Sequence, residues 1–229
     1  MGAVFTSRSR ILFFDLEYWV PPEAQRSRFG SLLANPGREG QKIIGGTFCL
    51  MDPTQVRDWP TNAEDIEMAN FWVWDYEDEK SMLSDIIDYL RSCWSSLEGK
   101  KDREADLILC GIGVSRFDVP VIAFRCSELG VATNEDLWEV LFTTKQVDLS
   151  NVGIPYPSKR DRDGSWVLYP RTANELCREF GVDSVKPSGK RVWDMYFDED
   201  FQGIRSRTEG EVFDSITVYR KMRKRIFKA

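Results

Sequence analysis

The segment from Arg10 to Glu17 constrains the fold of this chain more than any other. Four large apolar residues, Ile11–Phe14, lead directly into Asp15-Leu16-Glu17. A short apolar run of this kind is typical of a buried strand. Side chains at i and i+2 of a strand point to the same face, so Asp15 and Glu17 are expected side by side. Two carboxylates placed there repel each other unless a cation lies between them, or unless they are solvated at an exposed strand end.

The rest of the pattern predicts an α/β fold around a mixed sheet, with three antiparallel strands followed by parallel ones. β-branched and aromatic residues bounded by turn formers predict further strands at 43–51, 70–75, 105–110 and 147–149. Apolar residues at helical spacing predict helices at 77–97, from 119 onward, at 134–142, at 172–180 and at 207–226. Nothing marks a second domain, so residues 1–229 are expected to form one.

A long polar insertion separates the first two strands, at about 19–42. It contains several prolines and glycines and is locally basic. Loops of this length in a compact domain are commonly functional or mobile. A loop that contacts substrate and a plain surface insertion are both consistent with this composition.

Composition excludes several classes of site. The chain has no histidine, which removes Ser/His/Asp and Cys/His catalysis and histidine-bearing zinc sites. Its 5 cysteines are widely spaced and without a CxxC pair, so buried, reduced thiols are expected. The net charge of -6 does not suit a protein that coats DNA through many Lys and Arg side chains. It does suit an enzyme whose acids hold cations that meet phosphates.

No apolar run reaches the length needed to cross a membrane, and the N-terminus lacks the apolar core of a signal peptide. We therefore expect a soluble, cytoplasmic protein without a membrane partner.

Two further acids stand in informative places. Asp118 follows the fourth strand through a glycine-bearing turn and opens a helix, where an N-cap role is expected. Asp214 lies in the last helix among residues that pack, with Glu211 and Gly210 about one turn before it. An acid among packing residues is expected to have a function.

The ordered set Phe13-Phe14-Asp15-Leu16-Glu17, then Phe117-Asp118-Val119-Pro120, then an acid in a late helix resembles the DEDD superfamily of RNase H-like 3'–5' exonucleases. The proofreading-type exonucleases related to family B DNA polymerases are the most similar group. Two other segments agree with the resemblance. They are Gln146–Leu149, which resembles the short strand before a variable loop, and Leu176–Lys186, which contains Phe180-Gly181 and then a lysine.

The resemblance implies a two-metal site. Asp15, Glu17, Asp118 and Asp214 would ligate two Mg²⁺ or Mn²⁺ ions, because hard cations prefer carboxylate oxygens. Two such ions would activate a water molecule and stabilise the leaving oxygen of a phosphodiester. The implied substrate is a single-stranded 3' end, with DNA favoured over RNA. Replication or repair proteins are the implied partners.

Two positions depart from the family pattern. Gly113 stands where the family usually has asparagine, and Gly210 stands where it has the tyrosine that orients the attacking water. Three explanations remain open at this point. Glu209 or Glu211 takes over that role; the alignment of the last helix is displaced, so that Tyr219 or Tyr196 enters the site; or the nuclease is slow or inactive.

Three functions therefore remain in competition. The first is a metal-dependent exonuclease. The second, motivated by Gly210, is an RNase H-like module that binds nucleic acid without cleaving it. The third is an α/β scaffold whose acids have no common role.

Overall fold

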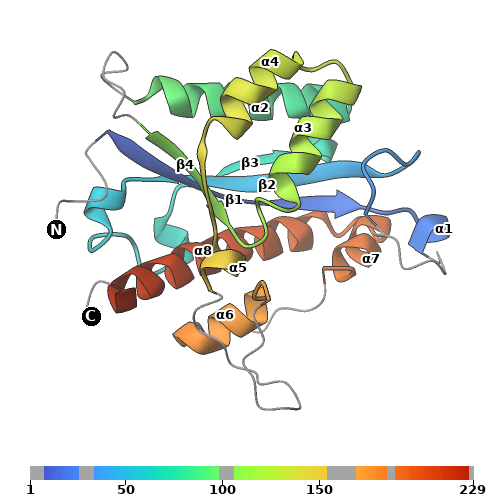
Figure 1. Ribbon diagram of the computed structural model, residues 1–229. Helices are drawn as coiled ribbons and strands as arrows, with labels where there is room; N and C mark the ends of the chain where they lie inside the picture. The colour runs from blue at the N-terminus through green and yellow to red at the C-terminus, as the bar shows by residue number, and fades with distance from the viewer. Residues whose placement is uncertain (1–7, 26–33, 98–105, 154–168, 185–188, 227–229) are drawn as a thin grey trace.

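A five-stranded sheet forms the centre of the protein in a computed structural model that describes residues 8–25, 34–97, 106–153, 169–184 and 189–226. Its order is β3-β2-β1-β4-β5 (Figure 1). β2 runs antiparallel to β1 and β3, whereas β4 lies parallel to β1 and β5 parallel to β4. This arrangement confirms the predicted mixed sheet, with three antiparallel strands followed by parallel ones. The strands are β1 (Ser9–Trp19), β2 (Lys42–Met51), β3 (Ala69–Trp72), β4 (Asp106–Gly111) and β5 (Lys145–Asp148).

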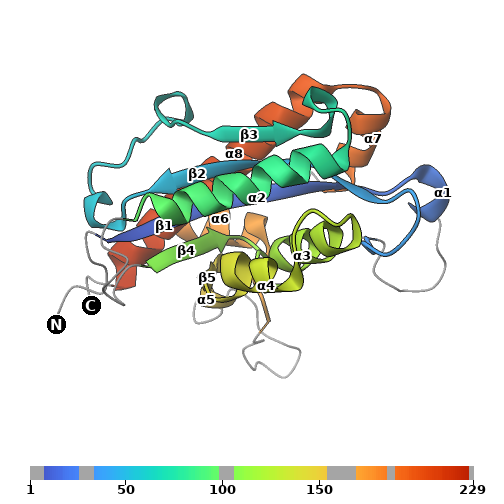
Figure 2. The ribbon, with the colours of Figure 1, turned by 90° about the horizontal axis from the view of Figure 1, so that it is seen from above.

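Helices cover both faces of the sheet. Figures 1 and 2 show α2, α3 and α4 on one face and the long α8, with α6 and α7, on the other. A π-helical turn, Trp138–Phe142, continues α4. The helices are α1 (Pro22–Gln25), α2 (Glu79–Ser95), α3 (Asp118–Glu128), α4 (Asn134–Leu137), α5 (Leu149–Val152), α6 (Ala173–Phe180), α7 (Arg191–Phe197) and α8 (Phe201–Ile226).

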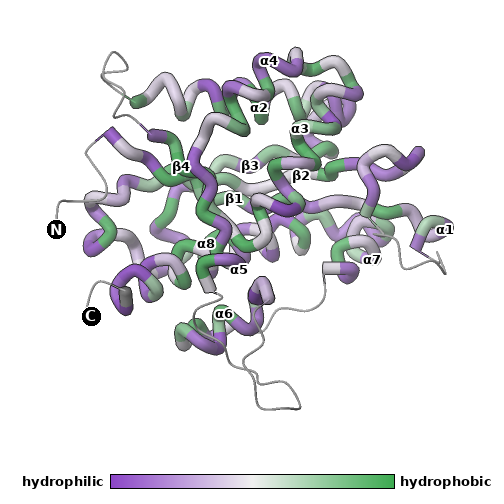
Figure 3. The backbone as a smooth tube through the Cα atoms, in the orientation of Figure 1, coloured by the Kyte–Doolittle hydropathy of each residue, from purple (hydrophilic) through white to green (hydrophobic). Residues whose placement is uncertain are grey.

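The alternation of β1 divides the apolar core into two layers. Leu12, Phe14 and Leu16 pack in the layer formed with α2 and α3. Ile11 and Phe13 pack in the layer formed with α8. In Figure 3 the hydrophobic colour runs along β4 and recurs along α8. The alternation continues past Phe13, so the next two side chains on that face point toward α8, and both are acidic.

The observed elements agree with the predicted ones in type and differ mainly at their ends. The third strand ends at Trp72, where a 3₁₀ turn takes over the residues up to Asp75. α7 was not predicted. α8 begins at Phe201, before the predicted residue 207, and the Asp200 carboxylate accepts the amide of Gly203 at 3.0 Å at its start.

Some predictions fall outside the described residues. They are the role of Lys186, residues 26–33 of the polar insertion and residues 154–168 of the loop before α6. The single domain over 1–229 stays a prediction. Within the described ranges, no helix combines the length and the apolar character that a bilayer crossing requires.

A buried ion pair ties α3 to the rest of the fold. The Arg125 guanidinium donates two hydrogen bonds to the Glu79 carboxylate, which stands at the start of α2. Glu79 also accepts the backbone amide of Ile43 in β2 at 2.9 Å. Arg125 in turn donates to the carbonyl of Pro36 and to Glu128. Because α3 begins at Asp118, this pair holds the helix that carries one of the candidate site acids.

Removing Arg125 is expected to be costly. The change Arg125→Met leaves the Glu79 carboxylate buried without its cation, which typically costs about 3–5 kcal/mol. Denaturant unfolding measures the loss. The control is Arg91→Met, because Arg91 pairs with Asp88 in solvent, where such pairs contribute about 1 kcal/mol or less. Equal effects of the two changes would contradict the structural role of the buried pair.

Candidate metal centre

Three acids, two from β1 and one from α8, meet between these elements. Asp15 and Glu17 extend from β1, and Glu211 extends from α8. One carboxylate oxygen from each lies within 4.8 Å of the other two. Such spacing suits a shared divalent cation. The predicted pairing of Asp15 with Glu17 on one face is confirmed, and their partner from the last helix is Glu211.

Asp118 lies on the open edge of β1. β4 pairs with β1 only as far as Phe13, opposite Cys110. Beyond that point α3 begins beside β1, where the Phe117 ring packs edge-to-face on Tyr18, and the Asp118 carboxylate is close enough to Asp15 to raise the pKa of that carboxyl. Asp118 is the first residue of α3, and Phe117 is its N-cap. The predicted N-cap role of Asp118 was therefore wrong by one residue, because the Val121 amide bonds to the Phe117 carbonyl at 2.9 Å and the helix begins one residue earlier than predicted.

The turn between β4 and α3 is held by Asp148 at the end of β5. The Asp148 carboxylate accepts the amides of Gly113 at 2.9 Å and Ser115 at 3.2 Å, and the Ser115 hydroxyl at 2.6 Å. It also accepts the amide of Ser150 at 3.0 Å. Gly113 has a φ of 91°, a conformation that favours glycine. These bonds fix the backbone that presents Asp118.

Burial and mutual repulsion dominate the electrostatics of the cluster. Burial, and then the charges of Glu211, Asp118 and Glu17, raise the pKa of Asp15 well above its usual value. Burial and the charge of Glu211 raise the pKa of Glu17 to about 8, against opposing effects of Arg207 and Thr208. Burial raises the pKa of Asp118 to about 7, although the amides of Asp118 and Leu16 favour its charged form. A bound cation would relieve this repulsion.

Arg207 and Thr208 complete the surroundings of the acids. The Arg207 Nη2 lies 3.0 Å from Glu211 Oε1, and its Nε lies 3.7 Å from Glu17 Oε1. The Thr208 hydroxyl lies 3.0 Å from the same oxygen of Glu17. A guanidinium thus already stands beside two of the three clustered carboxylates.

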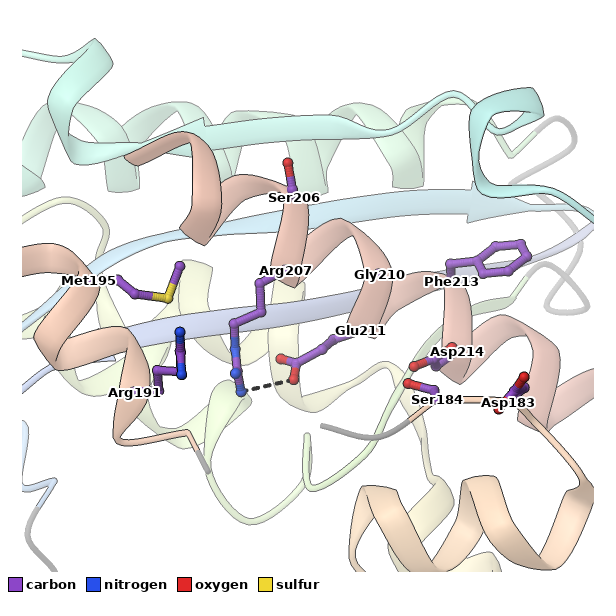
Figure 4. Close-up of a pocket in the computed structure, with 10 residues that line it drawn as sticks. All are labelled: Asp183, Ser184, Arg191, Met195, Ser206, Arg207, Gly210, Glu211, Phe213 and Asp214. Carbon is purple, nitrogen blue, oxygen red and sulfur yellow. Dashed lines mark hydrogen bonds and ion pairs between the residues drawn. The ribbon is translucent and has the colours of Figure 1, made fainter. Parts of the chain in front are cut away.

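Asp214 lies outside the group formed by Asp15, Glu17 and Glu211. It lines a cavity of about 460 Å³ beside α8, together with Glu211, Arg207 and Gly210. Figure 4 shows Asp214 near Ser184 and Asp183, separated from the carboxylate of Glu211. The acid of α8 that approaches β1 is therefore one turn nearer to the N-terminus than the resemblance implies.

This position of Glu211 bears on the open question at Gly210. If Glu211 is the ligand, the water-orienting tyrosine of the family, which stands four residues before the last acid, corresponds to Arg207 and not to Gly210. Gly210 lines the cavity, and a Cβ added there would meet no atom within 4 Å. Tyr219 packs in the core against Phe13 and Trp59. Tyr196 lies against Trp19.

Glu209 accepts a hydrogen bond from Asn70 on β3. Of the alternative residues considered at the sequence level, Glu211 is the one that the structure brings to the acids.

Sequence reasoning missed Arg207, Thr208 and Asp148. Arg207 and Thr208 lie one turn before Glu211 in a predicted helix. Helical spacing would therefore have placed both beside the acids once Glu211 was known to face β1. Asp148 was recognised only as part of a short strand. Three of its four accepted bonds come from Gly113 and Ser115, which are distant in sequence, and no local pattern indicates them.

The donor set fits a hard divalent cation. The clustered ligand atoms are all carboxylate oxygens, which Mg²⁺ and Mn²⁺ prefer. The five cysteines are buried and unbonded to one another, and the chain contains no histidine. The residues present therefore fit magnesium or manganese better than a metal that requires nitrogen or sulphur ligands.

No protein-family model and no curated protein matches the chain. Two solved structures of E. coli exonuclease I, in complex with 5cy-dA13 and 5cy-dT13 oligonucleotides, are similar at 12% and 11% identity, each with a TM-score of 0.46. A moderately thermophilic exonuclease I from Methylocaldum szegediense is similar at 13% identity and a TM-score of 0.48. Each match covers 96% of this chain and only 41–42% of the other, so the chain spans less than half of their length. The likeness concerns the fold.

The raised pKa values predict a pH-dependent stability without metal. Glu17 and Asp118 hold protons up to about pH 8 and 7 when folded, against 4.5 and 3.8 as ordinary values. The folded protein therefore binds more protons than the unfolded chain, so the free energy of unfolding falls as pH rises through this window. Thermal melts in a chelator should show this fall, and Glu17→Gln should flatten it. The control Glu64→Gln changes an exposed carboxylate, and a wild-type melting temperature that rises toward pH 8 would contradict the account.

Asp148→Asn is expected to destabilise the protein, because an amide nitrogen would face backbone donors. Losing hydrogen bonds to a buried charged group costs about 2–3 kcal/mol. Unfolding in urea gives the cost. Asp58→Asn, at an exposed position, serves as the control, and an Asp148→Asn protein as stable as this control would show that the turn does not depend on Asp148.

Proposed function

We propose that this chain is a metal-dependent 3'–5' exonuclease that hydrolyses phosphodiester bonds at nucleic-acid 3' ends, with single-stranded DNA preferred over RNA. The observation that carries the proposal is the meeting of Asp15, Glu17 and Glu211 between β1 and α8, with Asp118 at the edge of β1. Three of these carboxyl groups lie close enough to share one cation, and Asp118 is near enough to raise the pKa of Asp15.

We propose Asp15, Glu17, Asp118 and Glu211 as the residues that hold divalent cations. The resemblance implies a competing ligand set, in which Asp214 takes the place of Glu211. When bound, the metal would supply positive charge for the attacking water and for the leaving oxygen. In the overall reaction a water oxygen bonds to phosphorus, the bond to the 3' oxygen breaks, and that oxygen leaves as a hydroxyl with one hydrogen of the water.

Three features of the protein support the site. Asp148 holds the turn before Asp118 through bonds to the backbone amides of Gly113 and Ser115. Thr208 orients the Glu17 carboxylate. The cavity beside Glu211 gives the site access to an external ligand. The resemblance also supports action beside replication or repair proteins as a further part of the proposal.

A second candidate function is a nucleic-acid-binding module without turnover. Arg207, four residues before Glu211, favours this candidate, because an arginine that remains protonated cannot accept a proton from water. This candidate predicts oligonucleotide binding without release of nucleotides.

A labelled single strand incubated with Mg²⁺ or Mn²⁺ tests the proposal. Wild-type protein is expected to release nucleoside monophosphates from the 3' end. Glu211→Gln should reduce the rate by roughly 100-fold or more, since metal-based charge stabilisation is worth several kcal/mol. The matched variant Asp214→Asn should retain most activity.

Two outcomes would count against these assignments. Loss of activity in Asp214→Asn with retention in Glu211→Gln would restore Asp214 as the ligand. Strand binding without any release, under either metal and with an intact fold, would favour the second candidate.

A further inference from the structure

The guanidinium of Arg207 lies among the acids that we propose as cation ligands. It lies 3.0 Å from an oxygen of Glu211 and 3.7 Å from an oxygen of Glu17. The side chain is only 13% exposed. Both carboxylates belong to the three-acid group that fits a divalent ion. A fixed positive charge therefore shares two ligands with the proposed metal.

Arginine is suited to remain there as a cation. Its guanidinium stays protonated at all relevant pH values and is more weakly hydrated than an ammonium group, so it tolerates burial beside carboxylates. Arg207 stands one turn before Glu211 on α8, and such a spacing favours an intrahelical pair. The geometry of the helix thus keeps this charge beside the acids.

A second divalent ion would have to share this space with Arg207. Coulomb repulsion between a dication and a guanidinium that contact the same carboxylates is large in a partly buried site. The Thr208 hydroxyl and Arg207 Nε both approach Glu17 Oε1, so this oxygen already has partners other than a metal. The three-acid group can satisfy one ion without displacing them.

Figure 4 shows that Arg207 also faces the cavity. The cavity is lined by Arg191, Ser206 and Ser184 as well as by acids. A phosphodiester that enters from this side would meet the guanidinium, which matches the oxygens of a phosphate in geometry and charge.

We infer that Arg207 supplies the second positive charge of the site, so that the protein binds one divalent cation per chain and contacts a phosphate oxygen of the nucleic acid through this arginine. The inference rests on the proposed function, because it concerns the same acids. It replaces one of the two ions implied by the resemblance with a residue of the chain.

The test is the stoichiometry of Mn²⁺ binding to the intact chain. It is measured by electron paramagnetic resonance of free Mn²⁺ and by calorimetry. Wild type is expected to bind one ion. Arg207→Gln is expected to bind two, and to bind the first about tenfold or more tightly, because a neighbouring positive charge is removed. Arg207→Lys keeps the charge and should still bind one ion.

Arg191→Gln is the matched control, because it removes the same charge from the wall of the same cavity and should leave the stoichiometry at one. Two ions bound by wild type would overturn the inference even if Arg207→Gln fails to fold. The inference would also be overturned if Arg207→Gln bound the same number of Mn²⁺ ions, with the same affinity, as Arg191→Gln.

The result also separates this inference from the proposed function. Wild-type protein that binds two ions and releases nucleotides would overturn only the role of Arg207. Wild-type protein that binds no Mn²⁺ and releases no nucleotides would overturn both.

Discussion

The repulsion among buried carboxylates at the β1–α8 junction is the constraint on which the site depends. Asp15, Glu17 and Asp118 all have raised pKa values, with burial as the largest cause and neighbouring acids among the others. A fold gains nothing in stability from such a cluster alone. Natural proteins commonly accept this cost where a site has a function. Divalent cation binding is the chemistry that turns the repulsion into an attraction.

The fold supplies the acids through ordinary rules of strand and helix geometry. Alternation along β1 places Ile11 and Phe13 in the core between the sheet and α8. Asp15 and Glu17 follow on the same face of the strand. The pairing of β4 with β1 ends at Phe13, and α3, with Asp118 at its start, follows beside β1. The buried pair of Glu79 and Arg125 then fixes α3 against α2 and β2. Each acid is thus held by backbone or core contacts that do not themselves require the metal.

Local sequence patterns predicted the strand and the helix that carry the acids. β1 and its paired acids follow from a period of two, and the helix containing Glu211 follows from apolar spacing. The resemblance assigned Asp214 to the metal and left Glu211 as a candidate for orienting the water. Which of the two acids approaches β1 depends on the rotation of the helix against β1, and local patterns do not encode that rotation. Asp148 was missed for a similar reason: its bonds to Gly113 and Ser115 join residues more than 30 positions apart.

The position of bound Mn²⁺ in a crystal tests the central claim most directly. Anomalous scattering near the manganese edge would locate the ion without reference to any activity. The account predicts a peak bounded by Asp15, Glu17 and Glu211, with the Arg207 guanidinium beside it. A crystal with no peak at these acids, or with its peak at Asp183 and Asp214 instead, would contradict it.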